Sequence, residues 1–229
     1  MTSFCRFDLR TTDADAARAF YTRILGHDRA PIWPLHEQAL ARGARPHWLG
    51  QLAAVDVERT AAAFVERGAV RLGPTRATAD GGHAAVLRDP GGAVVAVGTP
   101  PRASSELDVV WHVLHTNDVA RATANYRDLF GWELTRRVQL GAQGDFQEFA
   151  WRAGGASVGA LSDIAGRPGV HAHWLFFFEV DALEPAIAAT RAAGGLVLDS
   201  FVLPSGERAC VCDDPEGAAF ALRERRQAV

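Results

Sequence analysis

Two histidines and one glutamate have the residue types and the spacing to do chemistry. His115 ends a predicted strand over residues 109–115, and His173 begins another over residues 173–180, which also contains Glu179. Because side chains two residues apart in a strand share a face, His173 and Glu179 point to the same side. Imidazole titrates near neutral pH, so the histidines could act as a general acid and base. Two imidazoles and a carboxylate could equally bind zinc or iron, and the spacing does not separate these options.

Apolar side chains on the same strand faces are expected to line a ligand site. Trp111 and Val113 share the face of His115, and Leu175 and Phe177 share the face of His173. A tryptophan beside aliphatic side chains makes a flat apolar wall that suits an aromatic ligand. Further candidate ligand-binding residues are Glu148, Trp151 and Arg208. Alternatively, His115 and His173 lie at the rim of the ligand site and have no functional role.

Other polar groups on these strands are expected to be structural. His112 points to the opposite face from His115, which predicts a core histidine bonded to backbone. Cys210 and Cys212 alternate onto one strand face and are interpreted as core-filling thiols rather than nucleophiles.

The elements that position these residues occur twice along the chain. Three matched pairs of segments carry the repeat, at spacings of 105, 126 and 125 residues: Thr12–Gly26 with Asn117–Gly131, His47–Leu49 with His173–Leu175, and Asp89–Ala93 with Asp214–Ala218. Repeats of this length indicate duplicated domains rather than solenoid units. The jump in spacing predicts that the first half lacks the hairpin strands of its first module, around residues 28–45, where a short helix over 36–42 is expected. Residues 100–105 form the predicted linker.

Each matched segment follows a strand-then-helix order with recognisable helix ends. Asp13 and Asp118 are placed as N-caps, and Gly26 and Gly131 end the helices that follow. Taken in order and twice, these segments resemble the glyoxalase/bleomycin-resistance/extradiol-dioxygenase superfamily, also called vicinal oxygen chelate proteins. The resemblance implies an α+β fold of duplicated βαβββ modules in two halves, residues 1–100 with a truncated first module and residues 107–229 complete. Each half is expected to form a cup around a ligand.

In this superfamily the cup often holds a divalent metal that polarises oxygens of a substrate, whereas some members carry no metal and sequester an antibiotic. The residues at the positions of the metal ligands, counted from the family motifs, are Arg6, Ala96, Trp111, Leu175 and Ala221. None of these side chains can chelate such a cation. The sequence therefore predicts no metal at the family position and no other cofactor.

Composition limits the range of partners. A net charge of −3 and a pI near 6.2 provide no basic field for nucleic acid or an anionic membrane. We expect a cytoplasmic protein, because the start of the chain lacks a signal-peptide core and the odd set of three cysteines fits reduced thiols. All 24 basic residues are arginine, so no lysine Schiff base can form. A monomer and a homodimer both remain open.

Two classes of function remain open at this stage. The first is a metal-independent protein that binds a small organic molecule in the C-terminal cup, with a link to secondary metabolism or antibiotic resistance. The second is an enzyme, either a lyase or isomerase that uses His115 and His173 in place of a metal, or a metal-dependent glyoxalase or dioxygenase type with displaced ligands. Fold resemblance alone does not choose between them.

Overall fold

The computed structural model describes residues 3–78, 80–101, 107–140, 144–167, 170–203 and 206–226. Most of the predicted linker, residues 102–105, lies outside these ranges. The first half contains β1 (Phe4–Thr11), α1 (Ala14–Leu25), β2 (Ile32–Pro34), α2 (Glu37–Leu40), β3 (His47–Ala53), α3 (Val57–Glu66), β4 (Val70–Arg71), β5 (Arg76–Ala77), β6 (His83–Arg88) and β7 (Val94–Gly98). The second half contains β8 (Val109–His115), α4 (Val119–Phe130), β9 (Glu133–Gln139), β10 (Asp145–Ala150), β11 (Gly159–Ser162), the 3-10 turn η2 (Ile164–Gly166), β12 (His173–Val180), α5 (Leu183–Ala192), β13 (Leu196–Val202), β14 (Arg208–Asp213) and β15 (Ala219–Glu224).

Each half of the sequence builds one mixed sheet. The strand order of the first sheet is β2-β1-β3-β7-β6-β4, with β5 paired to β6. The order of the second is β13-β14-β15-β12-β8-β11-β10-β9. The third and fourth modules show the βαβββ order, and the second adds the two-residue β5 to it. The first module has only β1, α1 and the three-residue β2, followed by α2. The predicted α+β architecture with a truncated first module is confirmed.

The described residues pack into two compact units that interleave along the chain. Unit 1 contains Met1–Arg6, Leu49–Ser105 and His112–Trp174, whereas unit 2 contains Phe7–Trp48, Glu106–Trp111 and Leu175–Val229. Each unit thus combines modules from both halves of the sequence. The boundaries inferred from the repeat, 1–100 and 107–229, describe the duplicated halves of the sequence and stay a prediction. The two packed units do not coincide with these halves.

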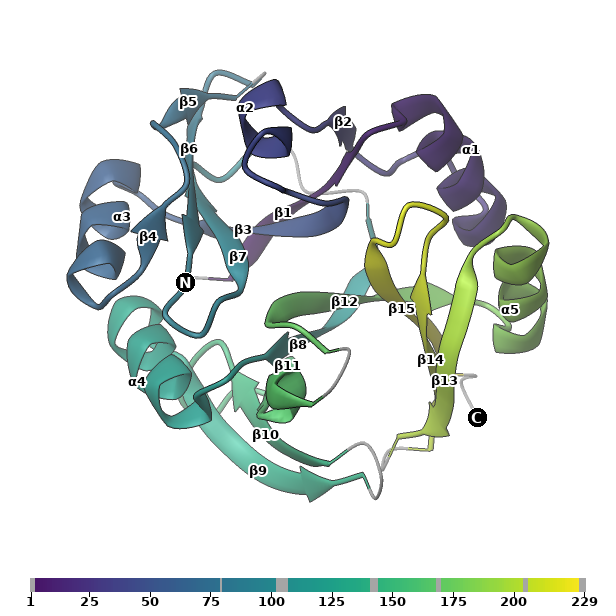
Figure 1. Ribbon diagram of the computed structural model, residues 1–229. Helices are drawn as coiled ribbons and strands as arrows, with labels where there is room; N and C mark the ends of the chain where they lie inside the picture. Colours follow the sequence, from purple (N-terminus) through teal and green to yellow (C-terminus); the bar gives the residue numbers. More distant parts are fainter. Residues whose placement is uncertain are drawn as a thin grey trace. The chain divides into compact units, whose positions relative to one another are not determined.

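The core of unit 1 is organised by a buried hydrogen-bond relay that links three elements. Trp174 Nε1 donates to Tyr126 Oη at 3.3 Å, and Tyr126 Oη donates to Asp89 Oδ2 at 3.1 Å. Burial raises the pKa of the Asp89 carboxyl and of the Tyr126 hydroxyl, so both groups favour their neutral forms. Tyr126 lies on α4, which packs beside α3 (Figure 1). The relay therefore links α4 to the turn that contains Asp89 and precedes β7.

Unit 2 contains the same relay, built from the matching residues of the repeat. Trp48 Nε1 donates to Tyr21 Oη at 2.9 Å, and Tyr21 Oη donates to Asp214 Oδ2 at 3.1 Å. Burial raises the pKa of Asp214 and of Tyr21 in the same way. Tyr21 lies on α1, beside α5 (Figure 1). The strongest matches in the repeat are thus residues that hold the fold together.

The predicted helix ends are also confirmed. The Asp13 carboxylate accepts from the backbone N–H of Ala16, and the Asp118 carboxylate accepts from that of Arg121. Gly26 and Gly131 adopt φ of 76° and 73°, a left-handed conformation that side chains disfavour. Among the described residues, no helix has the length and apolar character needed to cross a membrane.

Candidate functional site

His115 and His173 come together in unit 1, as the alternation of their strands predicts. Their ring centroids are 4.9 Å apart, although 57 residues separate them in the chain. His115 is buried at the end of β8, and its Nδ1 lies 2.9 Å from Ser162 Oγ on β11. Burial, with a smaller effect of the neighbouring His173, lowers the pKa of His115 to about 3. The ring is therefore neutral at physiological pH.

The His173 ring is oriented by a hydrogen bond to the backbone two residues earlier. Its Nδ1 lies 2.8 Å from the carbonyl oxygen of His171, and because a carbonyl only accepts, this nitrogen carries the hydrogen. Burial lowers the pKa of His173 to about 4. The exposed His171 ring is 4.7 Å from that of His173. Three imidazoles thus follow one another from the surface toward the buried end of β8.

His112 is a core residue, as expected. Its Nδ1 lies 2.8 Å from the carbonyl oxygen of Val158, and its ring stacks on Phe4 at 5.2 Å between centroids. Burial lowers its pKa to about 4. His112, Trp174 and Phe149 point toward α4, because Trp174 contacts Tyr126 on that helix and His112 and Phe149 both pair with Gly159. His115 and His173 alternate with these residues and point to the other face, which we call the histidine face.

Glu148 lies on the histidine face of the sheet. It pairs with Ala160 on β11, which in turn pairs with Val113 on β8. Its carboxylate is only 4% exposed and accepts from Arg136 Nε at 2.8 Å. The pairing raises the pKa of the Arg136 guanidinium, which keeps the charge on this exposed side chain. From the strand spacings, the Cα atoms of Glu148 and His115 are about 12 Å apart.

The other predicted site residues are distributed differently. Trp151 packs in the aromatic cluster of unit 1, 4.9 Å from Trp132 and 5.1 Å from His112, on the side of α4. Arg208 forms a surface ion pair with Glu184 on α5. Trp151 therefore packs on the face opposite to His115, whereas Arg208 belongs to unit 2.

Glu179 lies in unit 2 and engages arginines there. It is six residues beyond His173 on β12, about 20 Å along an extended strand. Its carboxylate pairs with Arg225 at 3.3 Å and with Arg223 at 3.7 Å. This pairing gives Glu179 a structural role in unit 2, and its assignment as a catalytic partner of the two histidines stays a prediction.

The positions of the family's metal ligands do not fit a metal. In unit 2, Trp111 is half-buried, Leu175 is buried, and Ala221 is buried and pairs with Phe177. Each of these side chains lacks a donor atom that could bind a divalent cation. In unit 1, Ala96 pairs with Gln51, and Arg6 forms an ion pair with Asp80 at 2.6 Å. Among the described residues, no three His, Cys, Asp or Glu side chains are arranged to hold a metal.

Two residues of the histidine face, Ser162 and Arg136, were missed by reasoning from sequence. They lie on strands whose pairing register was needed to assign a face. His171 falls on the same alternation as His173, so the sequence places it on the face of His173. For Ser162 and Arg136, the hydrogen bonds of the folded sheet supply the information.

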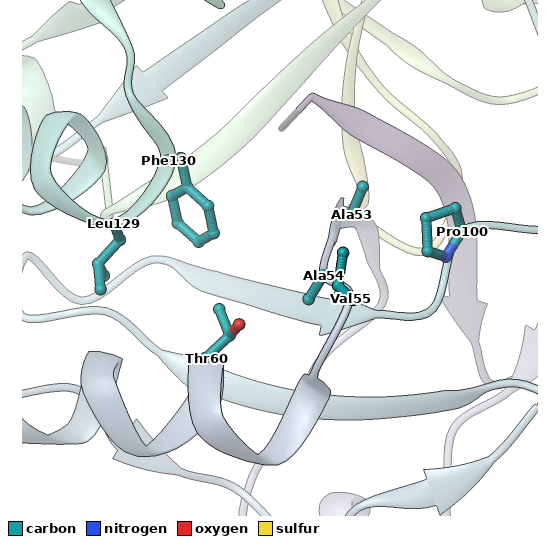
Figure 2. A pocket seen from close by; sticks show the side chains of 7 residues that line it. All are labelled: Ala53, Ala54, Val55, Thr60, Pro100, Leu129 and Phe130. Carbon is teal, nitrogen blue, oxygen red and sulfur yellow. The ribbon is translucent and has the colours of Figure 1, made fainter. Parts of the chain in front are cut away.

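A cavity of about 320 Å³ lies elsewhere in unit 1, beside α3 and the end of α4. Figure 2 shows its lining, in which Phe130 and Leu129 face the segment that leads into α3. The lining residues are Ala53, Ala54, Val55, Thr60, Pro100, Leu129 and Phe130. With a single hydroxyl among small and apolar side chains, this cavity lacks groups for catalysis, so the histidine face remains the candidate site.

Comparison with known proteins agrees with this architecture. Residues 109–222 match the model of the Glyoxalase/Bleomycin resistance protein/Dioxygenase superfamily. The chain is 29% identical over 244 aligned residues to CFP32, named as a candidate glyoxylase, from Mycobacterium bovis and Mycobacterium tuberculosis, with 94% of this chain and 92% of that protein covered.

Solved structures share the fold at low sequence identity. The homoprotocatechuate 2,3-dioxygenase from Arthrobacter globiformis superposes with a TM-score of 0.65 at 16% identity, over 97% of this chain and 79% of that one. The Mn(II)-bound glyoxalase from Novosphingobium aromaticivorans gives a TM-score of 0.62 at 12% identity, over 100% of this chain and 85% of that one. The C-terminal half of the chain, residues 109–222, therefore belongs to the glyoxalase/bleomycin resistance protein/dioxygenase superfamily, and the whole chain shares the fold of duplicated modules.

Proposed function

We propose that the protein binds a small organic molecule on the histidine face of its C-terminal sheet, without a metal at the family's ligand positions. The observation that supports this is the contact between His115 and His173, whose rings lie 4.9 Å apart. Burial lowers the pKa of both imidazoles, which favours their neutral forms. Neutral imidazoles both donate and accept hydrogen bonds, which suits a polar but uncharged ligand group. An aromatic ligand remains the expectation from the sequence.

Binding is favoured over proton transfer by the size of the pKa shifts. An imidazole with a pKa of about 4 is protonated in roughly one molecule in a thousand at pH 7, and charging it there costs about 4 kcal/mol. An efficient general base has a pKa near the working pH. His115, with a pKa of about 3, is still further from that range. A metal-free lyase or isomerase that uses this pair is therefore the second candidate function, supported by the contact of the imidazoles themselves.

Several finer features remain predictions from composition and resemblance. We expect no nucleic-acid or membrane partner, because the chain is slightly acidic. A cytoplasmic location is expected because the odd set of three cysteines fits reduced thiols. A role in secondary metabolism or antibiotic resistance is expected from other members of the superfamily. Monomeric and homodimeric forms are both compatible with a site whose histidines come from one chain.

The proposal is tested by ligand binding to protein stripped with a chelator and checked for residual metal. A panel of phenols, catechols and bicyclic aromatic compounds is screened by native mass spectrometry, and each hit is titrated against His115→Ala, His173→Ala and the control His83→Ala. His83 is an exposed histidine of unit 1 on β6. Loss of one hydrogen bond to a neutral ligand costs about 1 kcal/mol, or roughly a fivefold weaker affinity.

The same variants distinguish a binder from an enzyme. Turnover of a hit that falls by about 100-fold or more in either variant would favour the acid/base enzyme. Unchanged affinity and unchanged turnover in both variants would contradict the proposed site. Ligand affinity that appears only after a divalent metal is restored would contradict metal-independent binding.

A further inference from the structure

The distance between the His115 and His173 rings matches that of two imidazoles on one cation. A metal–nitrogen bond is about 2.0–2.1 Å, and the ring centre lies roughly 1.1 Å beyond the nitrogen. Two such rings are therefore about 4.5 Å apart at a right angle and about 5.2 Å apart at a tetrahedral angle. The observed separation of 4.9 Å lies between these limits. The ring separation is therefore compatible with a cation bound by both imidazoles.

The second nitrogen of each ring is already oriented by a neighbour. Nδ1 of His173 donates to the His171 carbonyl, and Nδ1 of His115 lies within hydrogen-bond distance of Ser162 Oγ. Metal-binding histidines commonly use one nitrogen in this way, which fixes the ring and leaves Nε2 for the metal.

Imidazole ligands set the class of cation. They suit the borderline divalent ions Zn²⁺, Ni²⁺ and Cu²⁺, whereas Mg²⁺ and Ca²⁺ prefer oxygen. Glu148 is committed to Arg136 and Glu179 lies in unit 2 with its own arginines. A cation held by the two histidines thus keeps positions open for water or for oxygens of a bound molecule.

We infer that His115 and His173 form a two-imidazole site for a borderline divalent transition-metal ion, at positions different from those of the family's metal ligands. The cation occupies the same imidazoles that the organic ligand is proposed to use. It therefore acts as a competitor of a metal-free binding function and not as its cofactor. Cation binding can be measured without any organic ligand. A negative result for the cation would therefore not contradict organic-ligand binding, and the reverse also holds.

The inference is tested with Cu²⁺ alone, the divalent ion that nitrogen ligands bind most tightly. Chelator-treated protein is titrated at pH 7.5 and followed by electron paramagnetic resonance, which reports the number of coordinating nitrogens, and Zn²⁺ is then used to compete. Wild-type protein should bind one equivalent with two imidazole nitrogens. His115→Gln and His173→Gln should each remove this signal or weaken binding by more than about tenfold.

Matched variants separate this site from surface binding. His171→Gln and His83→Gln change exposed histidines of the same unit and should leave the two-nitrogen signal intact. Ser162→Ala frees Nδ1 of His115 and should weaken binding by about tenfold without changing the number of nitrogens. A signal that persists in both His115→Gln and His173→Gln, or one lost in His171→Gln, would overturn the inference. Circular dichroism of each variant shows whether it is folded.

Discussion

Units 1 and 2 are built on the same buried framework and differ in the residues that could do chemistry. Each unit contains a Trp–Tyr–Asp relay, in which the tyrosine comes from one half of the sequence and the aspartate from the other. The relays match to within 0.4 Å in the Trp–Tyr distance, 3.3 Å against 2.9 Å, and have the same Tyr–Asp distance of 3.1 Å. The relay residues, which match in the repeat, thus stabilise the fold of both units. Residues with a functional role are therefore expected at positions where the two copies of the repeat differ.

The two units differ most at the positions of the histidine pair. The repeat places Arg10 where unit 1 has His115, and His47 where it has His173. Arg10 forms an ion pair with Asp8 at 3.1 Å, so this position in unit 2 carries a permanent charge. His47 keeps the local geometry, with Nδ1 2.7 Å from the Arg45 carbonyl oxygen. Only unit 1 therefore presents two neutral imidazoles in contact.

The largest effect that we expect from this difference between the units is a dependence of the free energy of unfolding on pH. Burial lowers the pKa values of His112, His115 and His173 from 6.5 to about 4, about 3 and about 4. Below pH 6.5 the unfolded chain binds protons that the folded chain does not, so stability should fall as the pH falls. Each histidine contributes up to about 1.4 kcal/mol per pH unit between pH 6 and 5. The raised pKa values of Asp89 and Asp214 act in the opposite direction and offset part of this slope.

Urea denaturation at pH 6.5, 6.0, 5.5 and 5.0 measures the slope. His115→Asn and His173→Asn should each flatten it by about 1.4 kcal/mol per pH unit, whereas Arg10→Asn should leave it unchanged. A slope that is the same in both histidine variants as in the parent protein would contradict the assignment of neutral rings to His115 and His173.

Removal of one tyrosine hydroxyl tests the equivalence of the two relays. Tyr126→Phe and Tyr21→Phe each deprive a buried carboxyl group of its donor and a tryptophan of its acceptor. We expect each change to lower the free energy of unfolding by about 2–4 kcal/mol, because buried groups left without partners are costly. Denaturation followed by tryptophan fluorescence checks this value. If one variant is as stable as the parent protein, the corresponding relay does not hold its unit together.

The smallest expected effect concerns the two Asp-Pro turns. Glu216 accepts hydrogen bonds from Thr11, Thr12 and the backbone N–H of Asp13 at the start of α1. Its counterpart in unit 1 is Gly91, whose carbonyl accepts from Asn117 Nδ2. Glu216→Ala should lower stability by about 1 kcal/mol, as loss of a helix-terminal carboxylate commonly does. Thermal denaturation should show this decrease for Glu216→Ala and a smaller one for Asn117→Ala; the reverse order would indicate that the turn of unit 1 is the more strongly fastened.

The sequence predicted the modules and the histidine pair because both depend on local patterns. Alternation along β8 and β12 was sufficient to place His115 and His173 on one face and His112 on the other. The interleaved units were not predictable, because matched modules look alike to a pattern read along the chain. Trp151 follows the last residue of β10, so alternation does not apply to it, and it packs with Trp132 and His112. The partners of Glu148 and Glu179 depended on strand register, which the sequence does not encode locally.

The central claim is that His115 and His173 are neutral hydrogen-bonding groups, and long-range ¹H–¹⁵N NMR of the imidazole nitrogens tests it most directly. Spectra are recorded between pH 7.5 and 5.0 and assigned with His115→Gln and His173→Gln. The structure predicts that both rings stay neutral throughout this range, with the hydrogen of His173 on Nδ1. Protonation of either His115 or His173 with a midpoint near 6.5 would contradict the claim and favour proton transfer at this site.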